Sequence, residues 1–440
     1  MKIWEEEEMI WNEAKECMSR DEIHNLQSKR LVKQVDNVYH NVEYYRKKMQ
    51  ALGVEPGDIQ TVDDIVKLPF TTKADLRDNY PFGTFAVPMS QIVRVHASSG
   101  TTGKATVVGY TRKDIEVWKE CVARAFAQTG VTRDDIIQVA YGYGLFTGGL
   151  GAHYGAENLG ATVVPMSTGN TKKLITMMKD FGATALACTP SYLLHIAETL
   201  EAEDAIKDIK LKAAICGAEP WTEQMRKQIE EKLGINAFDI YGLSEIMGPG
   251  VACDCIYHKG LHVNEDHFFP EILNPDTLAP CAEDETGELA FTTLTKEGIP
   301  LLRYRTRDLT SISYAKCECG RTTARLSRFK GRSDDMLIIR GVNVFPSQVE
   351  AALLEMGETS PHYMMIVDRV NNLDTLEVQV EVDGAFFFDR LSELDNLTKK
   401  IAHVLQQAIG LAVKVKLVEP NTIERSMGKA VHVIDKRKLV

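Results

Sequence analysis

The sequence predicts an α/β protein with two parts. The first is a large, multi-layer N-terminal domain with mostly parallel sheets and a strand-rich part, and the second is a small α+β C-terminal domain. The chain has 440 residues, which is too long for one small core. From residue 136 onward, apolar runs recur about every 25 residues with amphipathic helical stretches between them. After residue 285 the pattern is strand-rich, and it changes again near residue 334.

The predicted elements of the large domain follow in chain order. Residues 1–85 are polar and mostly helical in pattern. Several later runs, such as Ala185–Cys188, are apolar on both faces, which is typical of buried parallel strands. The amphipathic segment 221–233 predicts a helix that ends at Gly234. Strands are expected at 92–97, 136–141, 161–165, 184–188, 212–216 and 236–241.

The remaining elements belong to the strand-rich part and to the C-terminal domain. Gly331–Asp335 interrupts the apolar runs, so we place the domains at 1–333 and 334–440, with the boundary at Asp334. Helices are expected at 346–356 and 388–408. Strands are expected at 287–295, 301–304, 309–314, 336–340, 362–368 and 375–382.

Composition and charge exclude several classes of protein. Fifty-one basic and 62 acidic residues give a net charge of −11, which argues against a nucleic-acid-binding protein. The apolar runs are shorter than the roughly 18 residues of a membrane span. The acidic run Glu5–Glu8 is unlike a signal peptide. The nine cysteines do not form a dense disulfide framework. We therefore expect a cytoplasmic protein with small-molecule partners.

One segment has the composition of a phosphate-binding loop. Ser98–Lys104 follows a predicted strand and contains two glycines, four hydroxyl side chains and one lysine. Glycines allow tight turns whose N–H groups point inward, and hydroxyls and lysine add further donors. Because Ser98 stands where a Walker A loop needs glycine, this is not a Walker A loop. The alternative is a polar hairpin turn at the surface.

Two further segments pair an aromatic residue with a carboxylate. Tyr241 ends a predicted strand and would stack on a base, and Glu245 would hold Mg²⁺ on phosphate oxygens. Asp308 lies beside Arg305 and Arg307, whose positive charge would keep it ionised and suited to ribose hydroxyls. The alternatives are an ordinary loop and a surface strand of ion pairs.

The order of the segments carries more information than any one of them. Two more segments, Gly331–Asp335 and Ser426–Ala430, follow the three at 98–104, 241–245 and 304–308. In this order, the five segments resemble the acyl-/aryl-adenylate-forming superfamily. Three longer stretches resemble the phenylacetate–CoA ligase family within it. They are 141–155, 265–268 and 335–346.

The resemblance implies a two-step ligation of an aryl acid to coenzyme A, with ATP and Mg²⁺ as cofactors. The carboxylate attacks ATP to give acyl-AMP and pyrophosphate, and the CoA thiolate then displaces AMP. The resemblance also implies a homodimer and a mobile C-terminal domain that rotates about a hinge at Asp334. Lys429 would bridge the attacking carboxylate and the α-phosphate, and would act only in adenylation.

The same resemblance assigns roles to the nucleotide-binding residues. Ser244 would touch the α-phosphate, Glu245 would bind Mg²⁺, and Asp308 with Arg332 would bind the ribose. The loop on the β- and γ-phosphates comprises Ser98, Ser99, Gly100, Thr101, Thr102, Gly103 and Lys104. The adenine wall comprises Gly217, Ala218, Glu219, Pro220 and Tyr241, and Asp239 and Gly242 complete the set.

Aromatic and small residues are expected to line the acid pocket, because they suit a flat ring on a short arm. The alternative is that the aromatic side chains only pack the edge of the sheet. The predicted pocket residues are Tyr141, Tyr143, Phe146, Gly217, Ala218, Ile246 and Pro249.

Two cysteine pairs, Cys253 with Cys255 and Cys317 with Cys319, suggest a zinc site together with His258 and His262, which follow the first pair. The resemblance favours Cys255, His262, Cys317 and Cys319 as ligands, in a structural clip away from the reaction centre. Cys253 or His258 would be the substitutes. The alternative is that the cysteines are free and buried.

Three functions are weighed. The first is an aryl-acid–CoA ligase for phenylacetate or an analogue such as indoleacetate. The second is an adenylyltransferase that stops at AMP transfer, as coenzyme F-390 synthetases do. The third is a nucleotide-binding or zinc-clipped interaction protein without activity, which the presence of Glu245, Asp308 and Lys429 disfavours.

Overall fold

The computed structural model of the chain describes residues 9–98, 105–333, 337–340, 342–357, 362–370, 373–382, 391–424 and 431–438. Their contacts form two compact units. Unit 1 contains residues up to 188, 207–218 and 235–329, and unit 2 contains 189–206, 219–234 and the residues from 330 onward. The predicted boundary at Asp334 lies outside the described residues.

Unit 1 begins with helices, as the sequence predicts. Ser19 caps the longest of them, and Glu22 closes the capping box on the Ser19 backbone. These helices are α1 (Glu13–Glu16), α2 (Arg20–Asn41), α3 (Glu43–Ala51) and α4 (Lys73–Asp78). Short 3₁₀-helices lie at Pro56–Asp58, Val62–Lys67 and Met89–Gln91.

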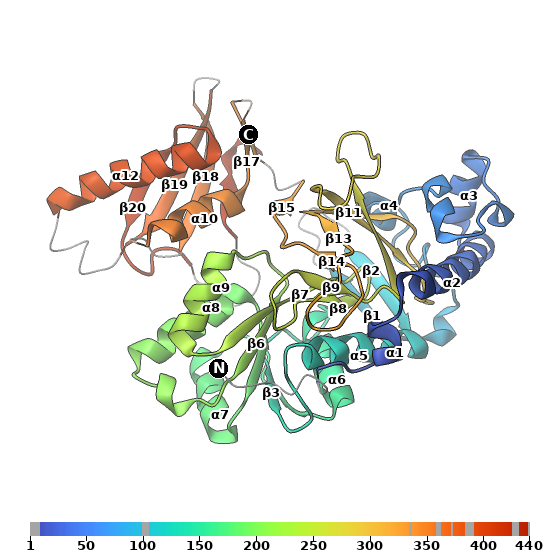
Figure 1. The fold of residues 1–440 in the computed structure, drawn as a ribbon. Coiled ribbons are helices and arrows are strands. Elements are labelled where there is room, and N and C mark those ends of the chain that lie inside the picture. The colour runs from blue at the N-terminus through green and yellow to red at the C-terminus, as the bar shows by residue number, and fades with distance from the viewer. Residues whose placement is uncertain are drawn as a thin grey trace. The chain divides into compact units, whose positions relative to one another are not determined.

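A nine-stranded sheet forms the centre of unit 1, in the order β13-β14-β9-β8-β7-β6-β5-β3-β4 (Figure 1). Strands β4, β3, β5, β6 and β7 are parallel, as predicted, and the others are antiparallel. The parallel strands are β3 (Ile136–Val139), β4 (Thr162–Pro165), β5 (Ala185–Cys188), β6 (Ala213–Gly217) and β7 (Asn236–Leu243). The others are β8 (Gly248–Cys253), β9 (Leu261–Val263), β13 (Ile312–Ser313) and β14 (Arg325–Leu326).

Three helices and two smaller groups of strands complete unit 1. Helices α5 and α6 pack on each other and against β8. The helices are α5 (Arg112–Ala127), α6 (Gly148–Leu159) and α7 (Thr171–Phe181). Strands β1 (Ile92–Ser98) and β2 (Thr106–Thr111) form an antiparallel hairpin, and β10 (Phe268–Leu273), β11 (Gly287–Thr293) and β12 (Tyr304–Thr310) form an antiparallel set.

The prediction of two strands at 301–304 and 309–314 was wrong. One strand, β12, runs from Tyr304 to Thr310. Before it, Arg303 has φ +44°, outside the extended region, and its guanidinium group binds Glu271 and two backbone carbonyls. After it, the chain passes at Ser311 into β13 of the large sheet.

Unit 2 contains the C-terminal residues together with α8 (Pro190–Ala202) and α9 (Glu223–Leu233). The predicted helix 346–356 is present as α10 (Pro346–Met356), and α12 (Leu391–Ile409) corresponds to 388–408. Strands β18 (Tyr363–Val370), β19 (Leu373–Glu381), β20 (Lys414–Val418) and β21 (Val433–Asp435) form a sheet in the order β20-β19-β18-β21. Short strands lie at β15 (Gly331–Arg332), β16 (Leu337–Ile339) and β17 (Val342–Val344).

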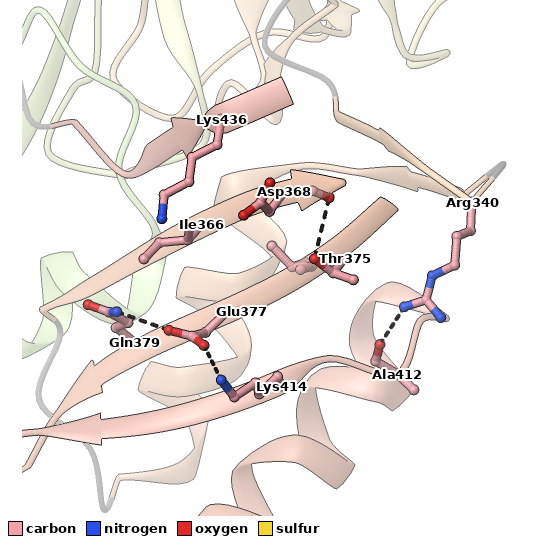
Figure 2. A pocket seen from close by; sticks show the side chains of 10 residues that line it. Arg340, Ile366, Asp368, Thr375, Glu377, Gln379, Ala412, Lys414 and Lys436 are labelled. Atoms are coloured by element: carbon pink, nitrogen blue, oxygen red, sulfur yellow. Dashed lines mark hydrogen bonds and ion pairs between the residues drawn. The ribbon is translucent and has the colours of Figure 1, made fainter. Parts of the chain in front are cut away.

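The sheet of unit 2 has two different faces. Buried side chains such as Met365, Val378 and Leu405 form a core between one face and the helices α10 and α12. Over the other face lies a cavity of about 500 Å³, in which Lys414 pairs with Glu377 at 2.6 Å and Arg340 donates to the Ala412 carbonyl (Figure 2). None of the site residues predicted from the sequence lines this cavity.

Candidate active site and metal centre

The turn between β7 and β8 carries the two residues assigned to the α-phosphate and to Mg²⁺. Residues 244–247 form this turn, and the N–H groups of Ile246 and Met247 both donate to the Leu243 carbonyl. The Ser244 hydroxyl lies 2.9 Å from the hydroxyl of Thr147, at the start of α6, and both side chains are buried. The turn therefore places Ser244 against a second hydroxyl group.

Glu245 follows in the same turn and is 3% exposed. Its Oε1 lies 3.4 Å from the Lys73 ammonium group at the start of α4. A buried carboxylate needs a positive partner, because burial otherwise disfavours its charged form. Carboxylate and hydroxyl oxygens are also the ligands that Mg²⁺ prefers. Glu245, Ser244 and Thr147 therefore carry oxygen atoms of the kind that this ion binds.

Tyr241 and Asp308 come together across two sheets. The Tyr241 hydroxyl donates to Asp308 Oδ2 at 2.6 Å, and the Tyr241 ring stacks on Phe329 with 4.3 Å between centroids. Asp308 is buried on β12, next to Arg307 with φ +71°. These two predicted nucleotide residues therefore share one location.

The charge around Asp308 differs from the expectation. Arg305 and Arg307 form ion pairs with the buried carboxylate of Glu288, on β11, at 2.8 and 3.3 Å. Their positive charge is directed at Glu288, since a strand places residues 305 and 307 on the same face. The Tyr241 hydroxyl is a hydrogen-bond partner of the Asp308 side chain.

The end of β6 explains why glycine and alanine stand at 217 and 218. A Cβ atom on Gly217 would lie 2.2 Å from the Ile240 carbonyl oxygen, so a larger residue does not fit. Ala218 has φ +75°, a conformation that disfavours bulky side chains. Asp239 is buried on β7, in register with Cys216. In unit 2, Glu219 accepts a hydrogen bond from the Ser191 N–H at 2.7 Å.

The predicted phosphate loop joins the two strands of the β1–β2 hairpin. Ser98 pairs with Thr106, and residues 99–104 lie outside the described residues. The hydroxyl oxygens of Ser98 and Thr106 are buried and have no hydrogen-bond partner among the described residues. Two unpaired donors at the base of a loop suit a ligand with acceptor oxygens.

The predicted acid-pocket residues divide into buried and exposed ones. The Tyr141 hydroxyl, which is buried, lies 3.4 Å from the Ile215 carbonyl of β6, and Ile246 is also buried. The hydroxyl of half-buried Tyr143 lies 3.3 Å from His153 Nδ1, and Phe146 is exposed. Pro249 accepts a hydrogen bond from Trp118 through its carbonyl.

Cys255, His262, Cys317 and Cys319 form one cluster, in which all four ligand atoms lie within 4.8 Å of one another. The sulfurs of Cys255 and Cys317 are 3.8 Å apart, and Cys319 Sγ lies 3.4 Å from His262 Nε2. None of the nine cysteines forms a disulfide. Tetrahedral zinc with Zn–S near 2.3 Å would separate two sulfurs by about 3.8 Å, so the cluster fits this ion.

The two substitute ligands lie elsewhere. The Cys253 thiol points to the Ala125 carbonyl, 3.7 Å away, and His258 Nδ1 lies 2.6 Å from Asp254 Oδ2. The remaining nitrogen of His262, Nδ1, is 3.1 Å from the Thr323 hydroxyl. This contact orients the ring and leaves Nε2 toward the sulfurs.

Two further predicted residues lie outside unit 1. Arg332 lies on β15 of unit 2, and Lys429 lies outside the described residues. Sequence reasoning missed the roles of Lys73 and Thr147, and also those of Tyr110 and Lys296, which contact the 244–247 turn. Thr147 lies within residues 141–155, a stretch that resembles the family. This resemblance was the one signal in the sequence that could have pointed to Thr147.

The segment 265–268, which supported the family resemblance, has a structural role in unit 1. Glu265 is 2% exposed at its side chain and binds Arg20 through both oxygens. Asp266 binds Arg124 at 2.9 Å, and the positive charges of His267 and Arg124 hold the pKa of Asp266 well below its usual range despite its burial.

Among the described helices, none has both the length and the apolar character to cross a membrane.

Comparison with known proteins gives matches over nearly the whole chain. The family model described as AMP-binding enzyme matches residues 24–293, and the AMP-binding enzyme C-terminal domain matches residues 341–437. The phenylacetate-coenzyme A ligase of Escherichia coli is 51% identical over 429 residues, which is 97% of each chain. The phenylacetate-coenzyme A ligase of Thermus thermophilus is 47% identical over 98% of this chain and 100% of its own.

Solved structures of one other ligase are similar in fold. 2-Hydroxyisobutyryl-CoA ligase in the postadenylation state, in complex with 2-HIB-AMP, has a TM-score of 0.92 and 28% identity, over 98% of this chain and 93% of its own. The same ligase in complex with 2-HIB-AMP and CoA, in the thioesterification state, has a TM-score of 0.73 and 28% identity, over 98% of this chain and 94% of its own.

Proposed function

The chain belongs to the phenylacetate–coenzyme A ligase family of AMP-binding enzymes, and on that premise we propose that it converts phenylacetate or a close analogue to its coenzyme A thioester. In the first step, a carboxylate oxygen bonds to the α-phosphorus of ATP, and the bond from that phosphorus to pyrophosphate breaks. In the second, the CoA sulfur bonds to the acyl carbon, the bond from that carbon to the AMP oxygen breaks, and the thiol proton is lost.

The observation that carries this proposal is the hydrogen bond from Tyr241 of β7 to Asp308, close in sequence to the turn that follows β7. Ser244 and Glu245 lie in the turn, and Tyr241, at the end of β7, donates to Asp308. The first step brings two anions together, so fixed donors and positive charge must stabilise the reacting phosphate. A Mg²⁺ ion held by Glu245 would neutralise phosphate charge. Ser244 would bind the α-phosphate, and Asp308 would bind the ribose together with Arg332.

The remaining nucleotide contacts follow from the same arrangement. Backbone N–H groups and side chains of Ser98–Lys104 would hold the β- and γ-phosphates, since this loop extends from the paired strands β1 and β2. The adenine would lie between Tyr241 and the segment Gly217–Pro220, as the family resemblance implies. Asp239 and Gly242 complete the site.

We also propose a domain movement between the two steps. Residues 1–333 and 334–440 would be the moving parts and Asp334 the hinge, as predicted from the sequence. A relative with 28% identity exists in a postadenylation and a thioesterification state, which supports two arrangements in this family. Lys429 would serve adenylation alone, because the same surface cannot present this lysine and build the CoA channel at once.

The lysine proposal predicts a selective defect. Lys429→Ala should lower acid-dependent ATP–pyrophosphate exchange by roughly 10²-fold or more, because the reacting anions lose a positive charge. The variant should still convert supplied phenylacetyl-AMP and CoA to the thioester within about threefold of the wild-type rate. Lys399→Ala, at an exposed lysine of α12, is the matched control and should alter neither reaction. Equal loss of both half-reactions would contradict the assigned role.

The aryl acid is proposed from the residues around the end of β6. Tyr141, Tyr143 and Phe146 would supply aromatic side chains, and Gly217 and Ala218 would contribute only backbone and one methyl group. A flat ring joined to a carboxylate by one methylene group matches these properties. Indoleacetate is a second candidate, because its ring is larger but attached in the same way.

A panel of acids tests this function directly. Pyrophosphate release and thioester mass should be measured with phenylacetate, indoleacetate, benzoate and short fatty acids in the presence of ATP, Mg²⁺ and CoA. We expect kcat/KM for phenylacetate to exceed that for benzoate by about tenfold or more, because loss of a methylene group weakens transition-state contacts. Acyl-AMP formation without thioester would favour an adenylyltransferase, and no reaction with any acid would favour a nucleotide-binding protein without ligase activity.

We further propose that Cys255, His262, Cys317 and Cys319 hold a structural zinc ion. The cluster joins the segment after β8 to the segment between β13 and β14, which lie at the antiparallel end of the large sheet. Four protein ligands would close the coordination sphere, and such closed sites are structural rather than catalytic. The homodimer and the cytoplasmic location stay predictions from the sequence.

Metal analysis of the purified protein tests the zinc proposal. The wild-type chain should contain about one zinc ion, and Cys317→Ala should lose it and unfold at a lower temperature, because metal binding contributes to folding free energy. Cys253→Ala is the matched control, since its thiol lies outside the cluster, and it should keep the metal. Zinc-free wild-type protein after growth with added zinc, or equal metal loss in both variants, would overturn the proposal.

A further inference from the structure

The backbone of the β7–β8 turn is held by two side chains from other parts of unit 1. The Lys296 ammonium group lies 3.0 Å from the Glu245 carbonyl oxygen and 2.8 Å from that of Ile246. The Tyr110 hydroxyl lies 3.2 Å from the Ser244 carbonyl oxygen and 3.0 Å from that of Met247, so its one hydrogen is shared between them. All four carbonyls of residues 244–247 therefore face one of these two groups.

These carbonyls depend on such partners. Residues 244–247 are all buried, and a turn inside the protein cannot satisfy its carbonyls by strand pairing or by bulk water. An unpaired buried carbonyl is costly, so loss of a donor would drive the turn to another conformation. Lysine suits this position because one ammonium group carries three donors.

Lys296 itself is rigidly placed. It is 1% exposed, and its ammonium group lies 4.7 Å from the centre of the Tyr110 ring. The backbone N–H groups of Glu297 and Gly298, directly after it, donate to the buried carboxylate of Asp114 on α5. Burial lowers the pKa of Lys296 to about 8, whereas the carboxylates of Asp114 and Glu245 favour its charged form.

From these contacts we infer that Lys296 and Tyr110 are positioning residues for adenylation, which fix the turn so that the Glu245 carboxylate and the Ser244 hydroxyl face the metal–nucleotide complex. This inference rests on the proposed function for the identity of that complex. Neither residue touches the reacting atoms. Both act through the backbone of the turn, in the way that outer contacts orient the ligands of a metal.

The inference concerns geometry at Glu245, so its test measures how strongly ATP binding depends on Mg²⁺. The dissociation constant of ATP is measured by calorimetry over a range of Mg²⁺ concentrations and in EDTA, for wild type, Lys296→Met and Tyr110→Phe. We expect the Mg²⁺ concentration for half-maximal ATP binding to rise by about tenfold in Lys296→Met, and less in Tyr110→Phe, because disturbing an outer contact weakens the metal site. ATP affinity in EDTA should stay within about twofold.

Tyr110→Phe keeps the ring and removes only the hydroxyl group, so the test does not depend on whether Lys296→Met folds. Tyr363→Phe is the matched control. This tyrosine is equally buried, donates to the Pro346 carbonyl in unit 2, and should leave the Mg²⁺ dependence unchanged.

The outcomes separate this inference from the proposed function. A Mg²⁺ dependence equal to wild type in both turn variants, or wild-type ATP binding that does not depend on Mg²⁺, overturns the positioning role. Wild-type protein that binds ATP with Mg²⁺ but forms no thioester with any acid overturns the proposed function. In that case, a shifted Mg²⁺ dependence in the turn variants would still support the positioning role.

Discussion

The short turn at residues 244–247 is the constraint on which the rest of the site depends. Four consecutive residues are buried, and their carbonyls need hydrogen-bond donors that the strands β7 and β8 cannot supply. Tyr110 from β2 and Lys296 from the segment between β11 and β12 supply them. The turn thus links the hairpin of the phosphate loop, the large sheet and the antiparallel strands that carry Asp308.

The net charge of the chain differs from the charge close to the candidate site. The chain has a net charge of −11, yet the proposed substrates ATP and CoA are themselves strongly anionic. Two lysines lie at the turn: Lys73 pairs with the Glu245 carboxylate, and Lys296 binds the backbone of the turn. Over distances longer than about 8–10 Å, salt screens the charge of the remaining surface. The net charge of the chain therefore argues against binding of nucleic acid, but it does not decide whether the chain binds nucleotides.

Much of the fold follows from local patterns. The parallel strands were predictable because residues such as Ala185–Cys188 are apolar on both faces, and α10 was predicted to the residue. The error at 301–314 has a different origin. Arg303 leaves the extended region because its guanidinium group binds distant groups, and the chain changes sheets at Ser311. No local pattern encodes either event.

In the candidate site, too, local patterns indicated some residues and long-range packing placed others. Tyr241, Ser244 and Asp308 were assigned because they lie in motifs whose order resembles that of the superfamily, and their roles stay predictions; the structure shows that Tyr241 donates to Asp308. Lys296 was missed, since Thr-Lys-Glu-Gly reads as a polar surface turn and only long-range packing buries the lysine. The choice of Cys255 over Cys253 likewise rested on resemblance, because alternate residues of an extended segment point to opposite faces and the sequence does not say which face is the core.

One measurement tests the central claim, that the held turn presents Glu245 to the metal of the nucleotide. It is a crystal structure of the wild-type chain with a non-hydrolysable ATP analogue and Mn²⁺, with the metal located by its anomalous scattering. The account predicts Mn²⁺ bound to the Glu245 carboxylate, with Lys296 and Tyr110 still on the four turn carbonyls. Mn²⁺ held away from Glu245, or a turn that has released Lys296 and Tyr110 to bind the nucleotide, would contradict it.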